Sequence, residues 1–203
     1  MARLSRCIIL SVSVSLMTVL PAVQAAIPTE AISEFHATLT QAMARGPKLG
    51  CAGRLQLMEP AVEATFDLPL LAEKSLRRHW HTLDGAQRAA FVATLKQSIV
   101  TTYATEFSKP DTVRFAMGES EPLPNGDVLV HSQLIPTDRD ALSLDYVLKP
   151  RGSQWRVVNV LADGVSDLAL RAAQYDAAMK QDGLDSLRQK IEAQTQQMRT
   201  RCQ

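Results

Sequence analysis

Histidine is the residue type in this chain that most directly suggests metal binding or acid–base catalysis, and the sequence holds four of them. His79 and His81 flank Trp80, and a spacing of two points their imidazole rings apart on a helix. No carboxylate or cysteine nearby completes the ligand set that a metal ion needs. His36 and His131 are isolated and are predicted on polar faces, where water solvates them. The sequence therefore predicts no metal site and no histidine-based catalysis.

Ser166 is the candidate nucleophile, because it follows Gly164 at the end of a predicted strand. The nucleophile-elbow pattern also needs a glycine two residues after the serine, and Leu168 stands there instead. The N-terminus of a helix explains Ser166 more simply, since its hydroxyl can accept a hydrogen bond from an unpaired backbone N–H. The sequence has no glycine-rich phosphate-binding loop either.

An aspartate and a tyrosine on a helix-covered antiparallel sheet could together isomerise an apolar substrate. Tyr103 and Tyr146 supply phenols, but Asp145 is predicted to face outward and Asp163 to lie in a turn. We therefore expect no carboxylate beside either phenol. A container for an apolar ligand needs no reactive group, since buried alkyl surface contributes about 25 cal/mol per Å². The sequence predicts a binding protein and not an enzyme, with a small apolar-substrate enzyme as the alternative.

The first 25 residues have the pattern of a signal peptide. Arg3 and Arg6 precede an apolar stretch at residues 8–20, and residues 23–25 offer small side chains for cleavage near Ala25. The stretch is too short for a convincing transmembrane helix, and an uncleaved N-terminal anchor is the alternative. No cysteine follows the stretch closely enough to carry a lipid anchor. We therefore expect an exported, soluble protein.

The net charge argues against some classes of binding partner, and the cysteine content bears on disulfide formation. Residues 1–25 hold two arginines and no acidic residue, so the mature chain has 20 basic and 21 acidic side chains. A near-neutral chain without basic clusters argues against nucleic acid and against electrostatic membrane binding. Cys51 and Cys202 are the only cysteines after the leader. In an oxidising compartment they form either a disulfide or two unpaired thiols.

Apolar spacing predicts helices on both sides of a group of strands. Asp84 and Gln87 match a capping box, and Phe91 begins an apolar stripe in steps of four that needs a wide apolar partner, such as a sheet. Pro60 is expected to kink or break its helix. The predicted helices span residues 28–43, 49–65, 67–80 and 84–107, and two more follow Ser166 and Gly183.

Alternation of apolar and polar residues predicts four strands joined by short turns, at residues 112–118, 127–135, 141–149 and 155–161. Short connections between alternating strands indicate an antiparallel meander. The predicted fold class is therefore α+β: N-terminal helices, a four-stranded antiparallel sheet and C-terminal helices, in one domain of residues 26–203. The overall shape could be NTF2-like. The inward apolar surface exceeds what two thin layers need, so the core either packs solid or leaves a hollow.

Several motifs resemble one known family in their order along the chain. They are Phe66-Asp67-Leu68-Pro69, the strand at residues 144–148, Trp155-Arg156-Val157-Val158, and Gly164-Val165-Ser166 followed by Arg171. They resemble the Mla-type periplasmic phospholipid carriers, also called toluene-tolerance or ABC transporter auxiliary proteins. The hopanoid-associated branch known as HpnM is the most similar. Asn159, where the family usually has aspartate, and the two cysteines depart from the pattern.

The resemblance implies a soluble periplasmic shuttle that holds lipid tails in an apolar cavity between sheet and helices. It would carry phospholipid or a hopanoid-type lipid between inner- and outer-membrane complexes, with membrane-anchored transporter components as partners. We expect a monomer without a cofactor. A ligand-free docking subunit of a transporter is a further alternative.

Apolar side chains on the inward faces are the candidate lipid-binding residues, and each has ordinary core packing as its alternative. The candidates are Phe66, Leu70, Leu71, Trp80, Phe91, Leu95, Ile99 and Tyr103 from the helices, and Phe115, Met117, Val130, Leu134, Leu144, Tyr146, Leu148 and Val157 from the sheet.

Overall fold

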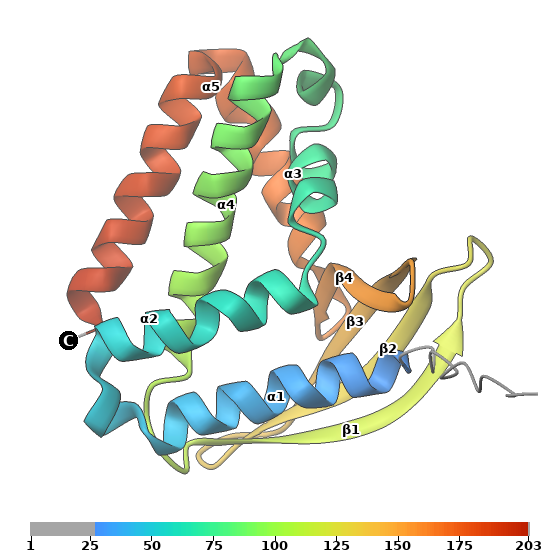
Figure 1. The fold of residues 1–203 in the computed structure, drawn as a ribbon, viewed down its shortest axis with the longest axis vertical. Helices are drawn as coiled ribbons and strands as arrows, with labels where there is room; N and C mark the ends of the chain where they lie inside the picture. The colour runs from blue at the N-terminus through green and yellow to red at the C-terminus, as the bar shows by residue number, and fades with distance from the viewer. Residues whose placement is uncertain (1–26, 203) are drawn as a thin grey trace, which may run out of the picture.

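The structure, a computed structural model, describes residues 27–202, and the predicted signal peptide at 1–25 lies outside these residues. Helices and an antiparallel sheet make up the fold, as the sequence predicts (Figure 1). The helices are α1 (Pro28–Ala44), α2 (Gly46–Thr65), α3 (Leu68–Leu76), the short 3₁₀ helix η1 (Arg77–Thr82), α4 (Gly85–Glu106) and α5 (Asp167–Arg201). The strands are β1 (Val113–Pro122), β2 (Val128–Pro136), β3 (Leu142–Arg151), β4 (Gln154–Ala162) and β5 (Val165–Ser166).

The sheet is an antiparallel meander in the order β1-β2-β3-β4-β5, so the prediction of four strands is wrong by one. The fifth strand has two residues, which pair with Leu161 and Ala162 at the end of β4. Asp163 and Gly164 between them both have positive φ angles, of 47° and 76°. Two such residues make a tight hairpin turn, which brings the chain back onto β4 before the helix begins. The sequence predicts only that Gly164 ends a strand, and the return of the chain onto β4 is visible only in the structure.

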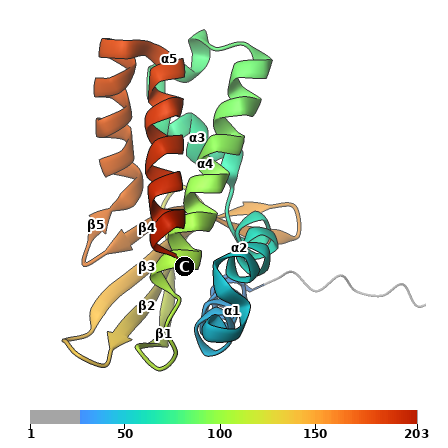
Figure 2. The same cartoon turned by 90° about the vertical axis from the view of Figure 1, so that its left-hand side faces the viewer.

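The helices form two groups (Figure 1). α1 lies along one face of the sheet and contacts β1, β2 and β4, and α2 packs on α1. α3, α4 and α5 stand together beyond this layer (Figure 2). Helices α2, α3 and α5 cover most of α4, so the predicted sheet is its partner only at the end of the stripe, where the centre of the Phe107 ring lies 5.5 Å from that of Phe115 on β1. Spacing in the sequence defines an apolar face, but a groove between helices can cover that face as well as a sheet can.

Glycine, not proline, breaks the long helices. Gly50 in α2 has φ 60°, whereas the backbone continues in helical geometry through Pro60, so the predicted kink at Pro60 is wrong. Pro60 and Gln56, whose carbonyl loses its helical partner, are both exposed, so water can satisfy that carbonyl. Gly183 has φ 75° and divides α5 into two segments that run side by side in opposite directions, as Figure 2 shows. This break agrees with the predicted helix boundary at Gly183.

A disulfide and a buried arginine join α2 to the C-terminal ends of α4 and α5. Cys51 of α2 is bonded to Cys202, with their Cα atoms 5.3 Å apart. Arg54, one turn further along α2, is buried and donates hydrogen bonds to the carbonyl oxygens of Ala104 (2.9 Å) and Cys202 (2.8 Å). These carbonyls lie at the C-terminal ends of α4 and α5, where a cation is favoured by the helix dipoles.

His36 is buried, and the prediction that water solvates it is wrong. Its Nε2 lies 2.9 Å from the hydroxyl of Tyr146, and its ring stacks on Phe115 with the ring centres 4.2 Å apart. Burial lowers the pKa of His36 to about 4. The error arose because histidine is polar by type, so the apolar stripe read from the sequence of α1 included Phe35 but omitted the buried His36 beside it.

The disulfide should contribute strongly to stability, because it closes a loop of 151 residues and restricts the unfolded chain. We expect the Cys51→Ser/Cys202→Ser double variant to lose about 3–5 kcal/mol of unfolding free energy in urea titrations. Reductant should destabilise the wild type by a comparable amount and leave the double variant unchanged. Equal stability of the two proteins without reductant would contradict this account.

Acid should destabilise the fold through His36. Its pKa in the folded protein is about 4, below the usual value of 6.5, so protonation favours the unfolded chain. The stabilising contribution is complete above pH 6.5 and is lost as the pH falls towards 4. Between pH 7 and pH 4.5, we expect the wild type to lose about 2 kcal/mol more unfolding free energy than His36→Gln. Equal losses in the two proteins would show that His36 does not titrate in this way.

Candidate functional site

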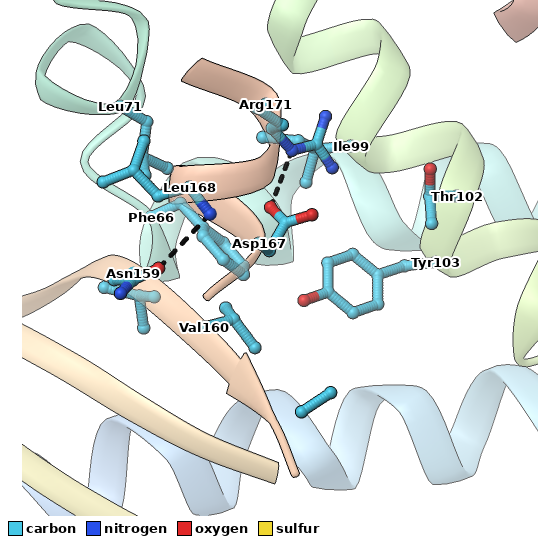
Figure 3. A pocket seen from close by; sticks show the side chains of 12 residues that line it. Phe66, Leu71, Ile99, Thr102, Tyr103, Asn159, Val160, Asp167, Leu168 and Arg171 are labelled. Atoms are coloured by element: carbon cyan, nitrogen blue, oxygen red, sulfur yellow. Dashed lines mark hydrogen bonds and ion pairs between the residues drawn. The ribbon is translucent and has the colours of Figure 1, made fainter. Parts of the chain in front are cut away.

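A pocket of about 220 Å³ lies where α4, the first turn of α5, strand β4 and the α2–α3 junction meet (Figure 3). Most of its lining is apolar, and its polar side chains come from α4, β4 and α5. The lining residues are Phe66, Leu71, Ile99, Thr102, Tyr103, Val157, Asn159, Val160, Ala162, Asp167, Leu168 and Arg171.

The junction between α2 and α3 fixes one wall of the pocket. Phe66 forms a parallel β-bridge with Val157 of β4, and the N–H of Asp67 donates to the carbonyl of Val157 at 2.9 Å. The Asp67 carboxylate caps α3 by accepting from the N–H of Leu70, and it also accepts from Nε of Arg151 at 2.6 Å. The predicted cap at Asp67 is confirmed. These bonds hold the helices against the sheet at the pocket.

The first turn of α5 supplies the charged wall. Asp167 and Arg171 are four residues apart, and Arg171 Nε donates to Asp167 Oδ2 at 2.6 Å (Figure 3). Burial alone would lower the pKa of Arg171, but Asp167 and then Tyr175 outweigh it and raise that pKa. The arginine is therefore charged at every physiological pH. The side chain of Asp167 is 53% exposed and that of Arg171 is 23% exposed, so the pair faces both the pocket and solvent.

Ser166 and Asn159 hold this turn in place. Ser166 Oγ accepts from the N–H of Ala169 at 3.0 Å, which confirms its predicted role as helix cap. Ser166 also donates to Oδ1 of Asn159, and the N–H of Leu168 donates to the same oxygen. Asn159 thus connects β4 to α5, and Ser166 is occupied in structural hydrogen bonds.

An aromatic cluster forms the wall on the side of α4. Phe35 packs edge-on against Phe66 and Tyr103, with ring centres 5.3 Å and 4.9 Å apart. The hydroxyl of Tyr103 points into the pocket on the same side as Asp167 (Figure 3). Burial raises the pKa of Tyr103, so the phenol stays neutral. The expectation that no carboxylate lies near Tyr103 is wrong, although Asp167 is ion-paired with Arg171.

The structure brings some of the predicted lipid-binding residues to this pocket and leaves others elsewhere. Phe66, Leu71, Ile99, Tyr103 and Val157 line it. Those that are instead fully or nearly fully buried in the core are Phe91, Leu95, Val130, Leu134, Tyr146 and Leu148, and those half-buried outside the pocket are Leu70, Trp80, Phe115 and Leu144.

Met117 is the clearest departure from the predicted faces, because it is 37% exposed on the edge strand β1. The β1–β2 register shifts between Met117 and Ser120. A bulge of this kind turns side chains away from the face that strict alternation assigns them.

Seven of the lining residues are absent from the predicted site: Thr102, Asn159, Val160, Ala162, Asp167, Leu168 and Arg171. Asp167 and Arg171 carry a usable signal, since opposite charges four residues apart on a helix form an ion pair. The positions of Thr102, Asn159 and Val160 carry none, because only the tertiary fold brings them to the pocket.

The remaining histidines lie outside the pocket. His79 Nε2 is 2.8 Å from Asp176, and His131 Nδ1 is 3.4 Å from Asp145 on the sheet. Within residues 27–202, no three histidine, cysteine or acidic side chains gather in a way that could hold a metal ion. In the same part of the chain, no helix combines the length and apolar character needed to cross a membrane.

Comparison with known proteins places these features in a family. A search of curated proteins found no match. Among solved structures, the phospholipid-binding protein from Ralstonia solanacearum, determined in complex with a phospholipid at 1.53 Å resolution, superposes with a TM-score of 0.71. It shares 18% sequence identity, over 83% of this chain and 94% of that chain, and therefore has the same fold. The profile of the family described as MlaC protein matches residues 33–193, and the chain thus belongs to the MlaC family.

Proposed function

We propose that this protein binds phospholipid by taking lipid tails into the pocket between β4, α4 and the first turn of α5. The observation that carries the proposal is the composition of the pocket, with a mostly apolar lining and a charged pair on one wall. Each tail methylene removed from water contributes about 0.8 kcal/mol, so about ten buried methylenes supply the roughly 8 kcal/mol of a micromolar affinity without any reactive group. The family and the phospholipid bound to the Ralstonia solanacearum protein support this assignment.

The pocket must widen to accept a lipid. Its volume of about 220 Å³ lies below the roughly 300–1,000 Å³ that small-molecule sites occupy. A larger apolar cavity, as the sequence resemblance implies, therefore requires α4 or α5 to move away from β4. The charged pair then stays at the solvent side, since half of the Asp167 side chain is exposed.

The physiological role that we propose is transport of the lipid through the periplasm between membrane-anchored complexes. Its support is the signal-peptide pattern of residues 1–25 and the near-neutral charge of the remaining chain, which suits release from membranes. A hopanoid cargo, as the HpnM resemblance suggests, would demand a wider opening, because fused rings cannot bend as acyl chains do. A binding role also fits the pairing of Asp167 with Arg171, because the carboxylate among the residues that line this pocket is ion-paired and not free to act as a base.

Filling the pocket tests the assignment. Val160 lines the pocket from β4, and an indole at this position would occupy much of its volume. Displacing only two tail methylenes costs about 1.6 kcal/mol, so we expect Val160→Trp to take up phospholipid from vesicles about tenfold less tightly. The measurement is lipid extracted from protein after its separation from vesicles.

Val147→Trp is the matched control, because Val147 is a half-buried valine of the neighbouring strand β3 that does not line the pocket. It should retain wild-type uptake, and the melting temperatures of both variants report any damage to the fold. Undiminished uptake by folded Val160→Trp would contradict the assignment.

A further inference from the structure

The charged pair of the pocket has the form of a receptor for a zwitterion. We propose that Arg171 and Asp167 bind opposite ends of a lipid headgroup, with the phosphate at Arg171 and a primary ammonium at Asp167. The proposal rests on the proposed function and deepens it, since it assigns headgroup selectivity to two named side chains.

The arginine has the donors that a phosphate needs. A guanidinium carries five N–H groups, and the contact with Asp167 uses the one at Nε. The terminal nitrogens form the fork that binds phosphate oxygens in pairs. Asn159, held from β4 through its Oδ1, and the Tyr103 hydroxyl also line this pocket and add neutral donors.

The aspartate has a matching acceptor. Its Oδ2 accepts from Arg171, and within residues 27–202 its Oδ1 accepts no hydrogen bond. With its side chain 53% exposed, the carboxylate is open to a cation arriving from solvent. A primary ammonium has three donors for that oxygen, whereas a quaternary ammonium has none.

Net charge decides between headgroup classes. The ion pair is neutral overall, so a headgroup whose only charge is its phosphate gains Arg171 but meets the negative Asp167. A headgroup that carries both charges satisfies both partners. The geometry therefore favours phosphatidylethanolamine over phosphatidylglycerol.

Competition between these two lipids tests the proposal. The protein is incubated with equimolar phosphatidylethanolamine and phosphatidylglycerol vesicles of identical tails, and the extracted lipids are quantified by mass spectrometry. We expect the wild type to take about threefold more phosphatidylethanolamine, as befits a partly exposed charge contact. In 1 M salt, where the Debye length is about 3 Å, the ratio should fall towards one.

Variants of the pair should change the ratio in opposite directions. Asp167→Asn leaves Arg171 unpaired and should shift the preference to phosphatidylglycerol. Arg171→Gln leaves Asp167 alone, so total uptake should fall while the preference for phosphatidylethanolamine increases. Damage to the fold would not produce opposite shifts.

The control pair is Arg188 and Glu192, also four residues apart on α5, with 3.2 Å between their charged atoms and outside the pocket. Arg188→Gln and Glu192→Gln should leave the ratio unchanged. Lipid uptake with a wild-type ratio near one, or with the same ratio in both pocket variants, would overturn the headgroup assignment and leave the carrier function standing. Absence of any lipid uptake by the wild type would instead overturn the proposed function, and the headgroup assignment with it.

Discussion

The backbone pairing of Phe66 and Asp67 with Val157 is the contact on which the pocket depends. Phe66 and Asp67 lie at the junction of α2 and α3, and Val157 lies in β4, some ninety residues later in the chain. The pairing therefore joins the helices to the sheet. Asp67 strengthens it by capping α3 and by pairing with Arg151. This contact fixes the α2–α3 wall of the pocket relative to β4, while direct packing of α2 and α3 fixes it relative to α4 and α5.

A second attachment lies on the opposite side, where the chain passes from β4 through β5 into α5. The Asp163–Gly164 turn, the Ser166 cap and the bonds of Asn159 orient the first turn of the helix. The pocket is thus bordered by two short polar attachments with apolar surface between them. A lipid larger than the pocket would require the walls to separate between these two attachments.

Local interactions were predictable from the sequence, whereas partners distant in the chain were not. The caps at Asp67, Asp84 and Ser166 depend on neighbours within three residues, and the structure contains each of them. The β-strand order followed from short turns, but the two-residue β5 escaped detection because no periodicity can appear in two residues. The site was predicted only in its apolar part, because apolar spacing identifies a buried face and cannot say whether that face meets side chains or a pocket.

The same limit explains the errors at His36 and Leu95. His36 is polar by type, yet it is buried in the core. There it contacts Tyr146 and Phe115, which are both more than seventy residues away in the chain. Leu95 belongs to the predicted stripe of α4, but it is covered by neighbouring helices, while Ile99 one turn later reaches the pocket. Residues of the same apolar stripe can thus lie in the core or line the pocket. Only the tertiary structure shows which of them do which.

Native mass spectrometry of the mature protein, purified without detergent and followed by extraction of its lipids, tests the carrier assignment most directly. The account requires a protein that carries phospholipid in a stoichiometric amount, or acquires it from vesicles. A mass equal to that of the polypeptide alone, unchanged after incubation with phospholipid vesicles, would contradict it. A stoichiometric hopanoid-type lipid would instead support the carrier role with a different cargo.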